Sequence, residues 1–165
     1  MPMTMVPEGA DKLEKMLQLL GEQAPGIAAS GLYEGAGAMA DEIKSAADGI
    51  QTEPFHYSVF PAYARAPSPE EKAAVTGAQM GIARFRREGF NAQTSVGYAK
   101  SGYAMVAGKR KPIPLIANSI NSGTSFMRKQ PFFRQAVAKG TPKATAKITD
   151  KIEEKYNEII MNNGG

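Results

Sequence analysis

His56 is the only histidine of the chain, and histidine is the side chain best suited to acid–base chemistry near neutral pH. Glu53 and Ser58 lie close to it along the chain and could supply the carboxylate and the hydroxyl of a catalytic triad. Closeness in sequence does not create that geometry, and neither a nucleophile-elbow motif nor a Ser-x-x-Lys motif is present. We therefore expect His56, Phe55 and Tyr57 to pack as an aromatic cluster rather than to catalyse a reaction.

Other residue types that could carry chemistry also lack the necessary pattern. Pairs of acids that could serve hydrolysis fall in stretches predicted to be helical, where solvated acids are common: Asp41–Glu42, Glu70–Glu71 and Glu153–Glu154. The sequence has no cysteine and no Asp-x-Asp pattern, so it predicts no metal site. Its glycines do not form a phosphate-binding loop after a strand. We expect neither a cofactor nor enzymatic activity.

Lysines recur at every fourth position near the C-terminus: Lys143, Lys147, Lys151 and Lys155. This spacing puts them on one face of a helix, which we call the lysine ridge. The ridge is either a solvated face that acids three residues further on partly neutralise, or a surface for DNA phosphates or an acidic subunit. The acids at those positions are Asp150, Glu154 and Glu158.

Two further basic groups stand out. Lys109, Arg110 and Lys111 are expected in a turn, where they could also contact DNA or an acidic partner. A second group is expected at the end of a helix, where cations complement the helix dipole: Arg84, Arg86 and Arg87. No helix-turn-helix or zinc-finger pattern is present, so we expect no sequence-specific reading of DNA.

The composition sets limits on the fold and on the setting in which the protein works. The 165 residues fit a single domain, and the formal net charge is +4. Much of the 42% hydrophobic fraction is alanine and there is no tryptophan, so we expect thin helix packing with some burial supplied by partner subunits. The sequence has no membrane span and no signal peptide at its start, which predicts a protein that stays in the cytoplasm where it is made.

The first fifty residues predict two helices. Leu13 to Leu20 carry one apolar stripe, which Gly21 and Pro25 are expected to close. A second stripe of apolar residues at steps of three or four runs from Leu32 to Ile50. Three glycines in this second helix either weaken it or let another helix or subunit approach closely: Gly31, Gly35 and Gly37.

Residues 51–69 change character, because prolines and aromatic residues accumulate there. We expect an extended loop or arm that inserts into a neighbouring subunit. Its candidate contact residues are Phe55, His56, Tyr57, Phe60 and Tyr63. Ser68 is expected to cap a helix that has Pro69 in its first turn and runs to about Gly89.

The remainder predicts extended structure followed by helices. Residues 91–107 are expected to form a hairpin around Lys100-Ser101-Gly102, and the type of the apolar segment 115–120 stays open. A short helix from Pro131 to Gly140 and a last helix from Thr141-Pro142 to Asn162 are expected, with a flexible tail at 163–165. This order favours an α+β fold in which a small antiparallel sheet packs with N-terminal helices and a C-terminal helix.

Residues 121–136, with the sequence NSGTSFMRKQPFFRQA, are the most distinctive stretch. Gly123 is expected to turn the chain, and Thr124 and Ser125 to bond the local backbone. Pro131 is expected to open a helix that Phe132 and Phe133 drive into an apolar groove, with Arg134 facing a carboxylate on the same or an adjacent subunit. The stretch is either such an assembly element or a well-anchored loop inside one subunit, and the two are compatible.

This stretch resembles the signature of the minor tail-component or neck protein family of long-tailed phages. Members show Glu-Phe-Gly-Thr-Ser, a short spacer and Pro-Phe-Leu-Arg-Pro-Ala, and Val96-Gly97-Tyr98 is similar to a further element of that family. Here Asn121-Ser122 stand in place of Glu-Phe, and Gln135 stands in place of the second proline.

The resemblance implies a virion structural protein, not an enzyme, made in the host cytoplasm and placed in the neck or tail region. It implies a small α+β subunit that forms a homo-oligomeric ring, of the hexamer or dodecamer type, at the head–tail junction. Its neighbours would be head-completion, tail-terminator or tail-tube proteins, and DNA would pass without sequence-specific contact. The alternative is a nonspecific DNA-binding accessory protein that uses the lysine ridge.

Overall fold

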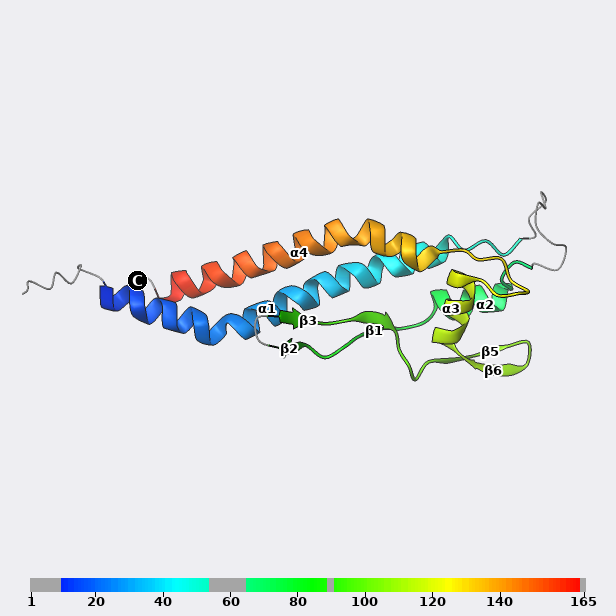
Figure 1. Cartoon of the computed structure of the whole chain (residues 1–165), viewed down its shortest axis with the longest axis horizontal. Helices are drawn as coiled ribbons and strands as arrows, with labels where there is room; N and C mark the ends of the chain where they lie inside the picture. The colour runs from blue at the N-terminus through cyan, green and yellow to red at the C-terminus, as the bar shows by residue number, and fades with distance from the viewer. Residues whose placement is uncertain (1–9, 54–64, 89–90, 164–165) are drawn as a thin grey trace, which may run out of the picture.

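The computed structural model describes residues 10–53, 65–88 and 91–163. Two long helices, α1 (Ala10–Asp48) and α4 (Phe132–Asn163), pack side by side along most of the length of the molecule (Figure 1). They are antiparallel, because Gly31 of α1 lies against Ile152 while Met39 lies against Gly140. Two short helices and three two-stranded antiparallel sheets complete the described chain, so the predicted α+β class is confirmed.

The prediction of two helices in the first fifty residues is wrong. Helix α1 continues through Gly21 and Pro25, and Pro25 lies inside it. A proline removes one helical hydrogen bond, but most helical stability in proteins comes from the packing of an apolar face. The C-terminal end of α4 supplies that packing, because Ile159 is buried beside Gly26 and Ile27.

The predicted break between Gly140 and Pro142 is also wrong, since both residues lie inside α4. Gly140 is buried, and a Cβ built on it would lie 2.7 Å from Sδ of Met39. The glycine therefore marks a close contact between the two helices rather than the end of one. Thr141 donates its hydroxyl to the carbonyl of Val137, which keeps its side chain within the helix.

Of the two alternatives for the glycines of α1, close approach is confirmed at two positions, and the approaching helix belongs to the same chain. A Cβ on Gly31 would lie 2.9 Å from Cγ1 of Ile152, and one on Gly35 would lie 2.5 Å from Cγ1 of Ile148. Gly37 has no neighbour within 4 Å of its Cβ position in the described chain. Gly31 and Gly35 therefore let the α4 isoleucines sit against the backbone of α1.

Helix α2 (Pro69–Thr76) begins as the sequence predicts. The hydroxyl of Ser68 accepts the backbone N–H of Glu71 at 3.1 Å, and the Glu71 carboxylate accepts the backbone N–H of Ser68 at 2.8 Å, which completes a capping box. The expected extension to Gly89 is wrong, because Gly77 caps the helix and strands follow. The three arginines expected at its end lie instead on a β-hairpin: Arg84, Arg86 and Arg87.

That hairpin lies along α1, on the side opposite α4 (Figure 1). Strand β1 (Met80–Ile82) pairs with β4 (Val96–Tyr98), and β2 (Arg86–Glu88) pairs with β3 (Asn91–Gln93). Between the two pairs, Ala83 N–H donates to the carbonyl of Ser95 at 2.7 Å, and the Thr94 hydroxyl donates to the carbonyl of Ala83 at 2.6 Å. The hairpin is tied to α1 by Phe85, whose N–H donates to the Tyr33 hydroxyl at 3.0 Å.

A second hairpin is formed by β5 (Tyr103–Val106) and β6 (Lys109–Pro112). Its turn residues Ala107 and Gly108 have φ of 50° and 73°, which is the pattern of a type I′ turn. The hairpin predicted around Lys100-Ser101-Gly102 is therefore wrong, since those residues connect β4 to β5. Lys109, Arg110 and Lys111 form a strand rather than the predicted turn.

The core lies at one end of the molecule, where helix α3 (Ile113–Ser122) packs near α2 and the start of α4 (Figure 1). The undecided segment 115–120 is thus helical. Ile43, Val75 and Ile120 are at most 1% exposed and form its centre. Phe132 and Ala136 bring the start of α4 into the same cluster. The loop from α3 to α4, which holds the most distinctive sequence stretch, is therefore built directly on the core.

Candidate functional site: the loop between α3 and α4

The loop begins with a tight turn that leaves little conformational freedom. Gly123 has φ of 76°, and its N–H donates to the carbonyl of Ser119 at 2.9 Å. Thr124 N–H then donates to the carbonyl of Met127 at 3.0 Å. The Thr124 hydroxyl accepts the N–H groups of Phe126 at 3.2 Å and of Met127 at 3.0 Å. Residues 123–127 are thus fixed by their own backbone and by one threonine.

The segment before α2 fixes the other side of the loop. Arg65 N–H donates to the carbonyl of Phe126 at 2.8 Å, and Arg128 N–H donates to the carbonyl of Arg65 at 3.1 Å. These bonds make an isolated parallel bridge between Arg65 and Met127. Met127 is 5% exposed and belongs to the core, so the bridge holds the loop at the point where its side chain is buried.

The side chain of Arg65 forms a bidentate ion pair with Glu71. The guanidinium donates to the two carboxylate oxygens at 2.8 and 2.9 Å. Glu71 is the one charged residue that is buried among the described residues, at 4% exposure. The hydrogen bonds from Arg65 lower the pKa of Glu71, although burial alone would raise it. Because Glu71 also completes the cap of α2, this one carboxylate joins the helix, the arginine and the loop.

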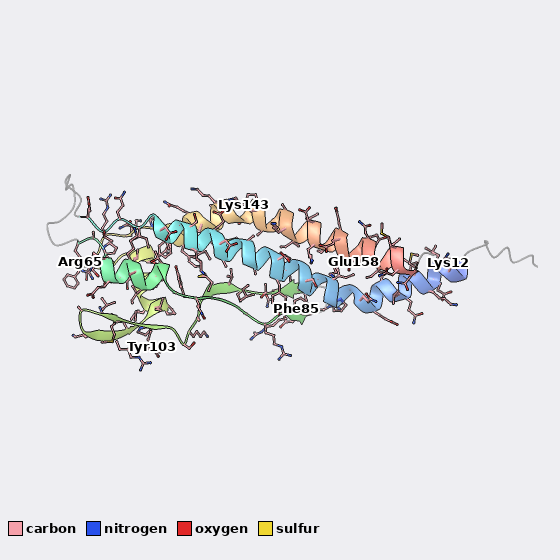
Figure 2. The ribbon with its side chains drawn as sticks, turned by 180° about the vertical axis from the view of Figure 1, so that it is seen from behind. Lys12, Arg65, Phe85, Tyr103, Lys143 and Glu158 are labelled. Atoms are coloured by element: carbon pink, nitrogen blue, oxygen red, sulfur yellow. The ribbon has the colours of Figure 1, made fainter. Side chains whose placement is uncertain are left out.

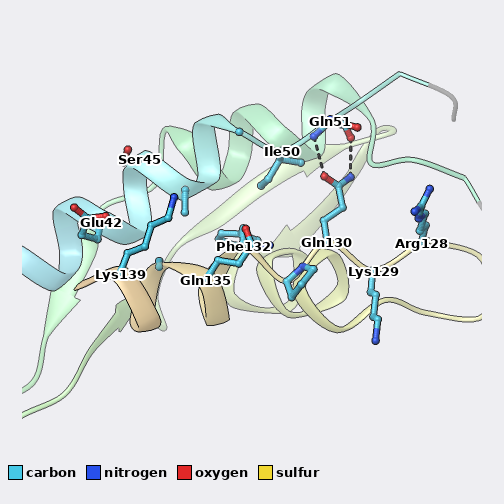
Figure 3. Close-up of a pocket in the computed structure, with 14 residues that line it drawn as sticks. Glu42, Ser45, Ile50, Gln51, Arg128, Lys129, Gln130, Phe132, Gln135 and Lys139 are labelled. Carbon is cyan, nitrogen blue, oxygen red and sulfur yellow. Dashed lines mark hydrogen bonds between the residues drawn. The ribbon is translucent and has the colours of Figure 1, made fainter. Parts of the chain in front are cut away.

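Two amide side chains hold the end of the loop. The Gln130 amide bonds the backbone of Gln51 in both directions, accepting its N–H at 2.9 Å and donating to its carbonyl at 2.8 Å (Figure 3). Gln130 N–H donates to the carbonyl of Ile120 at 2.7 Å. The Asn121 side-chain oxygen accepts the N–H of Phe133 at 3.1 Å, in the first turn of α4. These polar side chains carry out anchoring roles that the sequence pattern did not indicate.

The structure places the aromatic residues of the stretch as follows. Phe132 is 4% exposed, and its ring meets that of Phe133 edge to face, with centroids 6.4 Å apart. Pro131 immediately precedes α4 and is partly buried. Ser125 and Arg134 are exposed, and no carboxylate of the described chain pairs with Arg134. A carboxylate partner for this arginine would therefore lie outside the described residues.

Phe126 is the feature of the loop that sequence reasoning missed. Its side chain is 68% exposed, although its own N–H and carbonyl are held by hydrogen bonds to the Thr124 hydroxyl and the Arg65 N–H. A large apolar side chain held outward on a rigid backbone can enter a pocket of a partner with little loss of entropy. A phenylalanine in this stretch does not by itself indicate an exposed side chain, because the two phenylalanines that follow Pro131 turn inward.

A polar cavity of about 450 Å³ lies beside the loop, between the end of α1 and the start of α4 (Figure 3). Glu42 and Lys139 line it on the helices, and Lys129 and Gln130 line it on the loop. No group of three or more metal-ligating side chains occurs in the described ranges. The cavity is thus lined by side chains of both charges.

The lysine ridge is largely paired with acids. Lys143 forms an ion pair with Glu42 of α1. Lys151 and Lys155 pair with the acids three residues further on, Glu154 at 3.1 Å and Glu158 at 3.0 Å. The hydrogen bond to Glu154 raises the pKa of Lys151. The fourth lysine, Lys147, lines a hollow with Lys151 and two acids of α1: Glu34 and Asp41.

The remaining candidates fall in two groups. Lys109, Arg110 and Lys111 lie on β6, and the Arg110 guanidinium stacks 4.2 Å from the centre of the Tyr103 ring. The candidate arm contacts lie outside the described residues: Phe55, His56, Tyr57, Phe60 and Tyr63. No described helix is long and apolar enough to cross a membrane.

Comparison with protein-family models, with curated proteins and with solved structures gives no match for this chain.

Proposed function

We propose that this chain is a structural virion protein of a tailed phage or prophage, which forms a homo-oligomeric ring at the head–tail junction. The observation that carries the proposal is the outward position of Phe126 on the rigid loop of the Gly-Thr-Ser stretch. The sequence that resembles the neck family and the side chain best suited to anchor a neighbour are thus in the same place. The role is recognition and sealing by shape, without chemistry.

The distribution of exposed apolar side chains supports this role. A ring needs two different surfaces on each subunit, because its contacts run head to tail. At the core end, Phe126 is 68% and Leu115 is 56% exposed. At the opposite end, where α1 begins and α4 finishes, Leu13, Leu17 and Met161 are 58%, 60% and 81% exposed (Figure 1). Each end therefore offers apolar surface that a neighbouring subunit could bury.

The remaining candidate residues fit the same arrangement. Arg134 lies exposed beside the loop and is available to a carboxylate of an adjacent subunit. The aromatic residues of the arm would insert into a neighbour: Phe55, His56, Tyr57, Phe60 and Tyr63. Head-completion, tail-terminator or tail-tube proteins would contact the two faces of the ring, which is the setting implied by the resemblance.

Native mass spectrometry of the full chain tests the oligomer. We expect one closed ring, hexamer or dodecamer, for the wild type. Phe126→Ser should weaken each contact by about 2 kcal/mol, or roughly 30-fold, because central aromatic anchors dominate interface energies. The matched control is Ser125→Ala, an exposed neighbour in the same turn, which should leave the ring intact. A chain that stays monomeric with its head and tail partners present, or a Phe126→Ser variant that assembles normally, contradicts the proposal.

Deleting the gene in the genome that encodes this chain tests the role itself. Electron micrographs of the resulting lysate should show filled heads and finished tails that are not joined. A plasmid copy of the wild type should restore joined particles, and the Phe126→Ser variant should restore few. Normal infectious particles in the deletion strain would rule out a required role at the junction.

A further inference from the structure

The two β-hairpins concentrate the positive charge of the chain. Residues 80–112 carry seven lysines or arginines and a single acid, Glu88, which gives a formal charge of +6, compared with +4 for the whole chain. We call this region the basic strip, and its cations are Arg84, Arg86, Arg87, Lys100, Lys109, Arg110 and Lys111. All of them are exposed except Lys111, which is partly buried.

Two acids of α1 face the lysine ridge rather than the strip. Glu42 pairs with Lys143 of α4, and Glu34 lies close enough to Lys151 to raise its pKa. Within residues 10–53, 65–88 and 91–163, no carboxylate forms an ion pair with Arg84, Arg86 or Lys109. Helix α1 thus separates a lysine ridge that is largely paired with acids from the basic strip, in which Arg84, Arg86 and Lys109 form no ion pair among the described residues.

The strip is long and lies along one edge of the molecule. Phe85, between two of its arginines, lies near mid-length, and Tyr103, at the start of β5, lies toward the core end (Figure 2). The first hairpin alone, from Met80 to Glu88, spans on the order of 30 Å at about 3.3 Å per residue. Duplex DNA carries one charge per about 1.7 Å of its axis. A row of separated cations therefore matches duplex DNA better than it matches a compact anion.

At the core end, the strip is the two-stranded ribbon of β5 and β6. On β6, Arg110 lies opposite Met105 while Lys109 lies opposite Val106, so these two cations point to alternate faces. Val106 is 3% exposed and belongs to the core, so its face of the ribbon is packed against the molecule, and the face with Arg110 is the open one. Strand β2 consists of Arg86, Arg87 and Glu88, all exposed, so this part of the strip offers no apolar centre for a protein partner.

We propose that the basic strip, and not the lysine ridge, is the surface on which this protein contacts the phosphate backbone of duplex DNA. The contact is independent of base sequence and depends on salt. This inference rests on the proposed function, which brings DNA through the ring, and it adds which face of the subunit must line the passage. The inference excludes a ring in which the basic strip lies on the outer surface, away from the passage.

Fluorescence anisotropy with a labelled 30-base-pair duplex and the full chain tests the strip. If about five of the seven cations reach phosphates, the slope of log affinity against log salt is about −4.5, which weakens binding about 500-fold between 50 and 200 mM salt. Two duplexes of unrelated sequence should bind equally. A salt-independent affinity, or equally tight binding of polyglutamate of matched charge, overturns the proposal, and the latter result assigns the strip to an acidic protein.

Paired charge removals locate the contact. Arg86→Gln with Lys109→Gln removes two strip cations, and the slope should become shallower by about 2, with affinity at 0.1 M salt lower by up to about 60-fold. Lys143→Gln with Lys151→Gln removes the same charge from the opposite side of α1 and should change affinity about threefold or less, because salt screens distant charges. A larger loss in the ridge variant than in the strip variant overturns the proposal.

The oligomer of the strip variant separates this inference from the proposed function. Native mass spectrometry should show the same ring for the strip variant as for the wild type. A wild-type ring that forms but binds no DNA at 50 mM salt overturns the proposed DNA contact of the basic strip and leaves the proposed function standing. A monomer that binds DNA through the strip overturns the ring and leaves the DNA contact standing.

Discussion

Gly35 of α1 and Ile148 of α4 pack so closely that a Cβ built on Gly35 would lie 2.5 Å from Cγ1 and 2.7 Å from Cδ1 of Ile148. The carbonyl oxygen of Ala144 lies 3.2 Å from the same point, so the backbone of α4 is close as well. The two long helices are therefore held at a separation that only glycine permits at this position.

Gly35→Ala should destabilise the protein by about 1–2 kcal/mol, measured by urea unfolding followed by circular dichroism. The added methyl group overpacks the contact at a cost of about 1–3 kcal/mol, which outweighs the helix-propensity gain of up to about 1 kcal/mol. The control is Gly37→Ala, two residues further on, where no other part of the described chain lies within 4 Å of the Cβ position, and the same gain should raise stability. Equal effects of the two substitutions would show that the close contact does not form.

This contact also explains why the long helices were only partly predicted. The sequence located the apolar stripes of α1 and α4, but it divided each helix at Gly21 and Pro25 or at Gly140 and Pro142. A glycine that ends a helix and a glycine that admits another helix give the same local signal. Only the position of the partner helix, which tertiary packing decides, distinguishes the two.

The strand pairing and the site were harder to predict from the sequence, because they depend on contacts between residues that are far apart along the chain. The cap at Ser68 depends on residues within one turn and was predicted, whereas β1 pairs with β4 across more than a dozen residues and was not. Gln130 bonds a backbone 79 residues away, which no local pattern indicates. The Gly-Thr-Ser stretch was recognisable by its residues, but the outward position of Phe126 depends on its bridge to Arg65.

Glu71 should make the protein sensitive to acid. Its folded pKa lies below the ordinary value of 4.5 because Arg65 bonds its charged form, so the stabilisation is complete above that value and is lost as pH falls through the folded pKa. Glu71→Gln should cost about 1–3 kcal/mol at pH 7, because it removes the ion pair with Arg65, whereas the amide oxygen of glutamine can still accept the Ser68 N–H of the capping box. Since Arg65 is half-exposed, solvent screening keeps the value toward the lower end.

Chemical denaturation between pH 3 and pH 7 checks the role of Glu71. The difference in stability between the wild type and Glu71→Gln should shrink as the pH falls below 4.5, because protonation removes the same interaction. The control is Glu70→Gln, at an adjacent exposed acid in the first turn of α2, which accepts the N–H of Ala107 at 2.8 Å but pairs with no arginine among the described residues. A difference that stays constant down to pH 3 would contradict the assignment.

Tyr98 should make the protein sensitive to alkali. Its buried hydroxyl has no hydrogen-bond partner among the described residues, and burial raises its pKa to about 12. Because the folded state holds this proton more tightly than the unfolded state, stability is complete below about pH 10 and falls as the pH rises toward 12. Tyr98→Phe should reduce that loss and should raise stability by about 1 kcal/mol at pH 7, since an unpaired polar group leaves the interior.

Tyrosine absorbance during an alkaline titration, together with thermal unfolding, checks this prediction. The wild type should show one late-ionising tyrosine that is missing in Tyr98→Phe. Tyr103→Phe, at an exposed position on β5, serves as the control and should leave the late step in place. A loss of stability in Tyr98→Phe at pH 7 would mean that the hydroxyl has a partner.

Gly123, the single glycine of the loop, should be hard to replace, because geometry and space both exclude a side chain. Its φ of 76° and ψ of 169° fall in a region that is essentially confined to glycine. A Cβ there would also lie 2.9 Å from Cβ and 3.0 Å from the backbone nitrogen of Lys129. Gly123→Ala should therefore cost about 3 kcal/mol in chemical denaturation, the sum of backbone strain and overpacking.

Gly108 provides the matched control for this substitution. It has a nearly equal φ of 73°, but none of the residues that the structure describes comes within 4 Å of its Cβ position, so Gly108→Ala should cost only about 1 kcal/mol of backbone strain. Because the Gly123 turn also sets the position of Phe126, Gly123→Ala should weaken the ring even under conditions in which the subunit stays folded. A Gly123→Ala variant that loses no more stability than Gly108→Ala and still assembles would show that the loop is free to adjust, and that Phe126 is not held in place by it.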